Sequence, residues 1–171
     1  MPQFPTIYAG QRITSSLLTS METLQATKLS STSRASTTTN TDDPDLTLSL
    51  PANSSYIVDG LILFAADPAA DLKIGYTVPV SGTFTWSMFG QPSTTTTTSG
   101  TVITDGQSAG STGFMLGGVT SNAKVMTAQM KGFLTLGSTA GAFTFQWSQG
   151  TSNALATSVQ AGSYLLLHRV A

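Results

Sequence analysis

The sequence contains no cysteine and, among its 171 residues, only one histidine (His168) and one glutamate (Glu22). Without cysteine there is no disulfide framework, no thiol nucleophile and no thiolate metal site. Charged residues make up 9% of the chain, and seven Lys and Arg against eight Asp and Glu leave no basic surplus to neutralise phosphates. No apolar run approaches the roughly 20 residues of a membrane-spanning helix. We therefore expect neither a nucleic-acid partner nor a membrane partner.

In place of charge the chain carries hydroxyl groups, because 29 Thr and 22 Ser make up roughly 30% of it. Hydrophobic residues contribute 40% and aromatic residues 8%, which is enough to build a core and argues against disorder. The length is that of one domain, or of one domain with an arm. Since β-branched Thr favours extended backbone and tolerates water, the composition indicates strands with hydroxyl-rich solvent faces.

Residues 1–24 contain a proline-punctuated arm followed by the single helical pattern of the chain. Its apolar residues recur with a period near 3.6 and form one stripe: Ile13, Leu17, Leu18, Met21 and Leu24. This stripe predicts a helix over about residues 14–22, with Thr14 or Ser15 as its N-cap. A helix this short is marginal alone. It must therefore pack either on its own domain or on a neighbouring subunit or another protein.

From residue 25 onward the pattern predicts only strands and turns. Apolar stretches that alternate with polar residues, or that run continuously between Gly, Pro, Asn and Asp, predict strands within residues 46–50, 56–66, 72–78, 83–88, 102–103, 114–116, 125–136, 143–147 and 164–170. Eight to ten such strands with frequent turns are typical of an antiparallel β-sandwich or jelly roll over residues 25–171. Five consecutive threonines, Thr94 to Thr98, predict an exposed loop or edge.

Two of these strands, 56–66 and 164–170, have apolar side chains on both faces. This indicates that they are covered on both sides, and that 56–66 is a central strand. One arrangement places one face in the sandwich and the other in a contact between subunits. The other arrangement is a core formed wholly within one chain, with a disordered arm.

The titratable residues do not form a catalytic pattern. His168 lies within a predicted strand, and no nucleophile elbow, P-loop or zinc-protease motif occurs. The single acidic cluster, Asp42-Asp43-Pro44-Asp45, suits a calcium site, and a solvated turn that begins a strand accounts for it as well. Asn53-Ser54-Ser55 is a formal glycosylation sequon. We expect no enzymatic activity, no cofactor and no metal.

Three parts of the chain carry a family resemblance. They are Tyr8–Thr14 with the following Leu17, Leu18 and Met21, the segment Leu72–Pro79, and a late block formed by 132–137, 143–149, 154–157 and 161–165. Together they resemble small virion structural proteins of actinobacterial tailed phages, of the capsid-decoration or minor tail type. The resemblance covers most of the chain in outline.

The resemblance implies a jelly-roll virion protein that forms a trimer of the tumour-necrosis-factor-like type and attaches to a capsid or tail through its arm. No long shaft repeat is visible, which favours a capsid decoration (cement) protein over a fibre. The expected partners are further copies of the chain and the major capsid protein or other virion proteins. The expected contact residues belong to the arm and helix: Phe4, Ile7, Tyr8, Gln11, Arg12, Ile13, Leu17, Leu18 and Met21.

Residues 1–5 have neither a basic region nor an apolar core, so no signal peptide is expected. A virion protein is made in the host cytoplasm and works on the particle surface, which fits this feature. Two alternatives stay open. The first is a tail, baseplate or spike component, and the second is a carbohydrate-binding or adhesion module with Trp86 or Trp147 as sugar platforms. The alternation of both tryptophans with Thr and Ser favours their burial instead.

Overall fold

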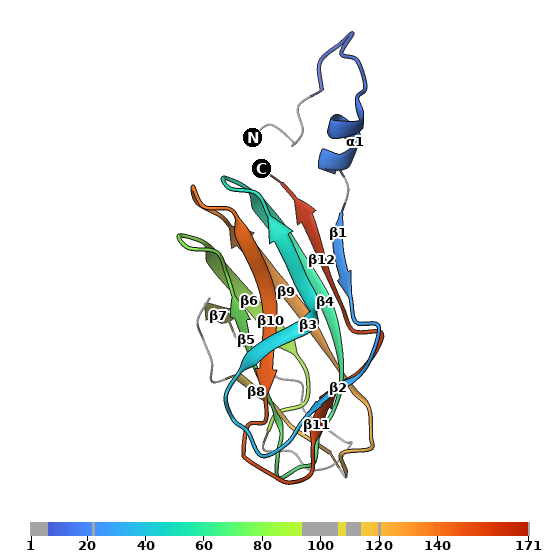
Figure 1. The fold of residues 1–171 in the computed structure, drawn as a ribbon, viewed down its shortest axis with the longest axis vertical. Coiled ribbons are helices and arrows are strands. Elements are labelled where there is room, and N and C mark those ends of the chain that lie inside the picture. Colours follow the sequence, from blue (N-terminus) through green and yellow to red (C-terminus); the bar gives the residue numbers. More distant parts are fainter. Residues whose placement is uncertain (1–6, 22, 94–105, 109–113, 120, 171) are drawn as a thin grey trace.

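The structure is a computed structural model that describes residues 7–21, 23–93, 106–108, 114–119 and 121–170. In these ranges one short helix precedes twelve strands (Figure 1). The elements are α1 (Ser15–Met21), β1 (Leu24–Thr27), β2 (Thr32–Arg34), β3 (Thr41–Leu50), β4 (Ser55–Ala65), β5 (Leu72–Thr77), β6 (Thr83–Phe89), β7 (Gly106–Ser108), β8 (Phe114–Leu116), β9 (Met126–Thr135), β10 (Gly141–Ser148), β11 (Thr157–Val159) and β12 (Tyr164–Arg169).

The strands form two antiparallel sheets. The larger has eight strands, in the order β1-β12-β4-β9-β6-β7, with β11 pairing with β2 and β4. The smaller has four strands, in the order β3-β10-β5-β8. The expectation of an antiparallel β-sandwich with almost no helix is confirmed, and β4 is central in its sheet, between β12 and β9. The expected strand at 102–103 and the threonine run at 94–98 lie outside the described residues.

The predicted helix is present as α1, from Ser15 to Met21. Thr14 is its N-cap, because the Leu17 backbone N–H donates to Thr14 Oγ1 at 3.3 Å. The first intrahelical hydrogen bond runs from Leu18 N–H to the Thr14 carbonyl at 3.1 Å. In Figure 1 this helix stands beyond the end of the two sheets, near the last strand, β12.

Aromatic side chains from both sheets fill the space between them. The Tyr76 ring on β5 contacts Phe84 on β6 at 5.1 Å, Trp86 on β6 at 5.0 Å and Phe143 on β10 at 5.5 Å between centroids. The Tyr76 hydroxyl donates to Met130 Sδ, and burial raises the pKa of this hydroxyl well above its usual value. Trp86 is 2% exposed and Trp147 is 0% exposed, so both belong to the core and neither is a sugar platform.

The outer faces of β4 and β12 differ from expectation. Within the single chain β4 and β12 are covered on one side only, which does not fit a core formed wholly within one chain and leaves the contact between subunits as a prediction. The inward residues Val58 and Ile62 are fully buried, whereas Ile57 on the other side of β4 is 45% exposed. On β12 the inward Leu165 is buried, and Leu166 is only half-buried. The large sheet therefore carries apolar residues on its outer side that remain exposed among the residues that the structure describes.

A tight turn before β5 places Asp71 with a φ of 58°. Its Oδ1 accepts the Gly118 backbone N–H at 2.9 Å. Burial raises the pKa of Asp71, the Gly118 hydrogen bond opposes this shift, and the nearby Asp67 carboxylate adds to it.

We expect Asp71→Asn to stabilise the protein at pH 7, because asparagine keeps the Gly118 hydrogen bond, tolerates positive φ and removes the half-buried charge. The gain is on the order of a few tenths of a kcal/mol, since water screens a half-exposed group. The folded state binds the Asp71 proton more tightly than the unfolded state, so the wild type gains stability as pH falls through the raised folded pKa. Urea unfolding of both proteins from pH 7 to pH 4 should show the difference shrinking, and a difference that grows would contradict this account.

Candidate functional site

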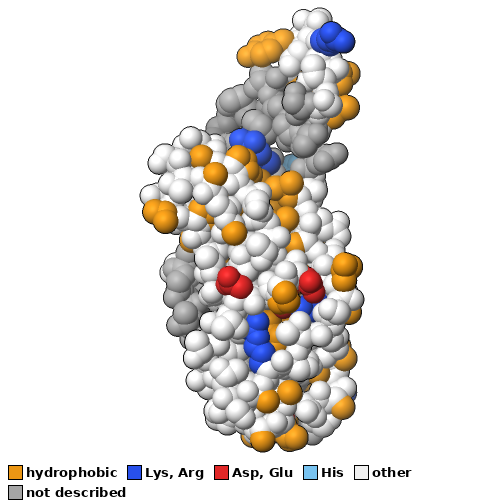
Figure 2. All heavy atoms as spheres, in the orientation of Figure 1, with side chains coloured by type: hydrophobic (Ala, Val, Ile, Leu, Met, Phe, Trp, Pro, Cys, Tyr) orange, Lys and Arg blue, Asp and Glu red, His pale blue; other side chains and the backbone are white. Residues whose placement is uncertain are grey.

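The N-terminal segment presents an apolar surface away from the sandwich. A hydrogen-bonded turn, in which Tyr8 N–H donates to Gln11 Oε1 and Gln11 N–H donates to the Tyr8 carbonyl, is followed by α1. Its exposed large hydrophobic residues are Ile7 (58%), Tyr8 (71%), Ile13 (69%), Leu18 (50%) and Met21 (40%). Figure 2 shows hydrophobic side chains together with a basic one on this projecting end.

Other residues expected to make contacts also lie on this segment. Gln11 and Arg12 are exposed, and Leu17 is half-buried. Phe4 lies outside the described residues. Three residues of the predicted helical stripe, Ile13, Leu18 and Met21, stay outside the core of their own domain, because each keeps 40% or more of its surface exposed. Leu24, the last residue of the stripe, begins β1 and packs against the core.

A second surface with exposed apolar residues is the side of the larger sheet that points away from the core. We call this surface the outer face. Three cross-strand rows from β12 through β4 and β9 to β6 make it up: His168–Ile57–Phe133–Thr85, Leu166–Asp59–Lys131–Ser87 and Tyr164–Leu61–Gln129–Phe89. Phe133 is 50% exposed and Phe89 is 39% exposed. Side chains directly opposite on one face of an antiparallel sheet are close neighbours, so these apolar residues form a patch.

One ion pair interrupts the outer face. Lys131 Nζ contacts Asp59 Oδ1 between β9 and β4, and both side chains are largely exposed. Beside it lies a hollow of about 250 Å³, which Leu61, Gln129 and Tyr164 line together with the two residues of the ion pair. An exposed pair of this kind contributes little to stability, typically about 0–1 kcal/mol. Its position between the rows that carry the exposed Ile57, Phe133 and Phe89 suits the recognition of a partner surface.

The outer side of the smaller sheet has the opposite character. Its outward side chains on β3, β5 and β10 are polar or small: Asp42, Thr47, Ser49, Lys73, Thr77, Ala142, Thr144 and Gln146. In Figure 2 most of the visible surface is uncharged and not hydrophobic. Hydroxyl side chains thus occur on both outer sides, and the outer face differs because it also carries the exposed apolar residues Ile57, Phe133 and Phe89.

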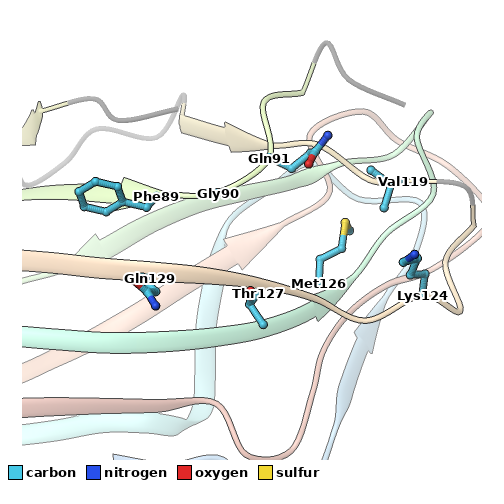
Figure 3. A pocket seen from close by; sticks show the side chains of 8 residues that line it. All are labelled: Phe89, Gly90, Gln91, Val119, Lys124, Met126, Thr127 and Gln129. Atoms are coloured by element: carbon cyan, nitrogen blue, oxygen red, sulfur yellow. The ribbon is translucent and has the colours of Figure 1, made fainter. Parts of the chain in front are cut away.

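A cavity of about 640 Å³ opens at the β6 side of the outer face (Figure 3). Residues 89–91 line one side, and the other side is lined by Lys124, Met126, Thr127 and Gln129, together with Val119. The groups in its lining that could bind a ligand are the Phe89 ring, the amides of Gln91 and Gln129, and the ammonium of Lys124. An aromatic ring beside amide groups is chemically suited to a sugar, with the ring under its apolar face and the amides on its hydroxyls.

The acidic cluster has a different role from the expected solvated turn, and that interpretation was wrong for Asp43. Asp43 lies in β3 with a 0% exposed side chain, paired with the equally buried Lys28. Lys28 Nζ is 3.0 and 2.9 Å from the two carboxylate oxygens, and Trp147 Nε1 donates to Asp43 Oδ2 at 2.9 Å. Sequence reasoning missed this pair because Lys28 stands alone in a polar stretch that shows no motif.

Arg34 covers the same network from outside. Its guanidinium lies 4.0 Å over the Trp147 ring and donates to the Thr41 and Asp42 carbonyls at 2.9 and 2.8 Å. Burial lowers the pKa of Arg34, while Asp43 and Asp42 act in the opposite direction. The short strand β2 is thereby held against the start of β3.

No group of three or more His, Asp or Glu side chains in the described ranges could hold a metal ion. His168 is an exposed residue of β12, opposite Ile57. No helix among the described residues is long and apolar enough to cross a membrane. Comparisons with protein-family models, curated proteins and solved structures find no match for this chain.

Proposed function

We propose that the protein is a non-enzymatic structural component of a phage particle, a homotrimeric capsid decoration protein that binds the head shell through its N-terminal segment. The observation that carries this proposal is the pair of separate exposed apolar surfaces, one on the arm and helix and one on the outer face of the larger sheet. Contiguous exposed apolar patches mark interaction sites. Two of them on one small chain suit a protein that assembles with itself and with a second protein.

The strand pairing supports a jelly-roll arrangement. A jelly roll has eight strands. Eight strands remain here when four are left out of the comparison, namely β2, β6, β7 and β11. The first of them pairs with the eighth (β1 with β12), the second with the seventh (β3 with β10), the third with the sixth (β4 with β9) and the fourth with the fifth (β5 with β8). These are the pairs of one long hairpin. Folding that hairpin over places β12 beside β4 and β10 beside β5, as the sheets are ordered here.

The outer face supports self-association. Ile57 and Phe133 lie directly opposite each other on β4 and β9 and remain about half exposed. Covering them with equivalent surfaces of other copies would remove apolar area from water, at roughly 25 cal/mol per Å². Because cyclic symmetry closes such an assembly, a trimer covers the outer face of all three subunits and leaves none of them exposed.

The arm supports attachment to another protein. An extended segment with exposed aromatic and aliphatic anchors can order on binding and cover a large surface. Tyr8 and Ile13 are the most exposed of these anchors, and Arg12 adds one positive charge between them. The Trp residues take no part, since both are in the core.

We expect removal of residues 1–22 to leave a folded trimer that no longer binds particles. The described residues of the deleted part, 7–21, contribute nothing to the buried core, so the circular dichroism spectrum and the oligomeric mass should be retained. Co-sedimentation with particles stripped of this protein measures binding, and at least a tenfold loss is expected. A full-length control with Leu155→Asp, which changes an equally exposed apolar residue elsewhere, should bind normally. Undiminished binding by the deletion variant contradicts the role of the arm.

The location on imaged virions separates head from tail. Copies distributed over the shell support decoration, and a few copies at the tail support a baseplate or spike component instead. The 640 Å³ cavity favours carbohydrate binding as a second candidate, because Phe89, Gln91 and Gln129 offer a ring and two amides. Retention of the trimer on immobilised glycans, with no binding to stripped particles, would favour that candidate.

A further inference from the structure

We propose that Lys28 and Asp43 form an intramolecular isopeptide bond, an amide between the lysine Nζ and the aspartate Cγ. The two groups are in direct contact, with Nζ 3.0 Å from Oδ1 and 2.9 Å from Oδ2, which places the amine nitrogen beside the carboxylate carbon. Both side chains are 0% exposed. Lys28 follows β1 of the larger sheet and Asp43 belongs to β3 of the smaller one, so the amide joins the two sheets.

The dry setting favours condensation over a permanent ion pair. Two buried charges carry a large desolvation penalty, which their mutual attraction offsets only in part. Amide formation removes both charges and releases one water molecule. It also leaves a carbonyl and an N–H group, and the existing neighbours can form hydrogen bonds with both. Thr32 Oγ1 lies 2.8 Å from Nζ and can accept the new amide N–H.

Polar groups around Asp43 are placed to assist the reaction. The backbone N–H groups of Asp45 and Leu46 donate to Oδ1 at 3.1 and 3.2 Å, which is the arrangement that stabilises a developing oxyanion. Trp147 Nε1 donates to Oδ2 at 2.9 Å and holds the oxygen that leaves. Asp45 Oδ2 lies 3.4 Å from Nζ, near enough to carry a proton.

The step balances without an external reagent. The Lys28 ammonium passes one proton to Asp43 Oδ2, and the neutral amine attacks Cγ while charge collects on Oδ1. Asp45 takes a second proton from the attacking nitrogen and delivers it to Oδ2. The Cγ–Oδ2 bond breaks, water leaves, and one hydrogen stays on the amide nitrogen. The ammonium and carboxylate charges have then cancelled.

The intact mass of the full-length, denatured protein tests the proposal directly. We expect a mass about 18 Da below that of the sequence, the mass of one water molecule. Trypsin should fail to cleave after Lys28, and peptide 13–34 should be joined to peptide 35–73. Cleavage after Lys131 should be normal, since its partner Asp59 is a solvent-exposed contact with no comparable surroundings.

Matched variants test the assigned roles. Lys28→Arg keeps the cation and should show the full sequence mass. Asp45→Asn keeps the pair and should form the bond at least tenfold more slowly. Asp43→Asn should still react, losing ammonia, about 17 Da, in place of water.

The wild-type measurement decides the matter even where a variant fails to fold. Full sequence mass with cleavage after Lys28 overturns the proposal. A loss of about 18 Da that maps to Asp59-Gly60 or Asp105-Gly106 also overturns it, because an aspartate before glycine can lose water by cyclising on its own backbone.

Discussion

The double variant Ile57→Asp, Phe133→Asp is expected to run as a monomer in size-exclusion chromatography with light scattering, at one third of the mass of the wild-type assembly. The two residues are opposite each other on β4 and β9 and are 45% and 50% exposed. In the proposed trimer they become buried. An unpaired carboxylate transferred into such an interface costs several kcal/mol, which exceeds what a small contact can offset.

The variant chain itself should remain folded, because both side chains point away from the core in the single chain. Ser49→Asp is the matched control. It adds the same charge to an exposed β-strand position on the outer side of the smaller sheet, and it should leave the trimer intact. A double variant that stays trimeric shows that the subunits meet through another surface. A wild-type protein that is monomeric at micromolar concentration contradicts the trimer itself.

The strand positions could be predicted because period-2 alternation is a local signal. Phe84, Trp86 and Met88 alternate with Thr and Ser, and all three are buried on β6. The helix was predictable for the same reason, from the spacing of Ile13, Leu17 and Leu18 and the capping Thr14. Each of these patterns lies within a few residues of sequence.

The apolar pattern on both faces of β4 left two interpretations open, cover by another subunit or cover by the same chain. Sequence alone shows that Ile57 and Leu61 are apolar, and it does not show whether the surface covering them belongs to the same chain. The structure leaves Ile57 exposed, which is why self-association carries the proposed function. A second apolar face on a strand is therefore as much a prediction about assembly as about the core.

The buried charge network could not be predicted because its parts are distant in sequence and of unlike type. Lys28, Asp43 and Trp147 come from the segment after β1, from β3 and from β10. No spacing rule joins them, and a run of aspartates usually indicates a solvated turn. The position of Asp43 within β3, with its side chain inward, decides that one aspartate of the cluster is buried and Asp42 is not.

Asp43→Ala is expected to lower the free energy of unfolding by about 3–5 kcal/mol, the usual cost of removing one partner of a buried ion pair. The loss arises from what the substitution leaves behind. The Lys28 ammonium stays buried, and Trp147 Nε1 and the backbone N–H groups of Asp45 and Leu46 lose their acceptor. The loss is expected whether the two residues are joined by an ion pair or by an amide. Urea denaturation at pH 7 measures it.

The control is Asp42→Ala, which removes an exposed carboxylate one residue away. Asp42 accepts a hydrogen bond from Gln146 Nε2 at 2.8 Å, so a loss below about 1 kcal/mol is expected. The pair Lys28→Met, Asp43→Leu should recover part of the loss, because apolar residues can replace a buried ion pair at little cost. Recovery should stay incomplete, since the Trp147 indole N–H and the Asp45 and Leu46 amides still lack an acceptor. Equal losses in Asp43→Ala and Asp42→Ala would mean that water reaches this site and that Lys28 is not held in a dry core.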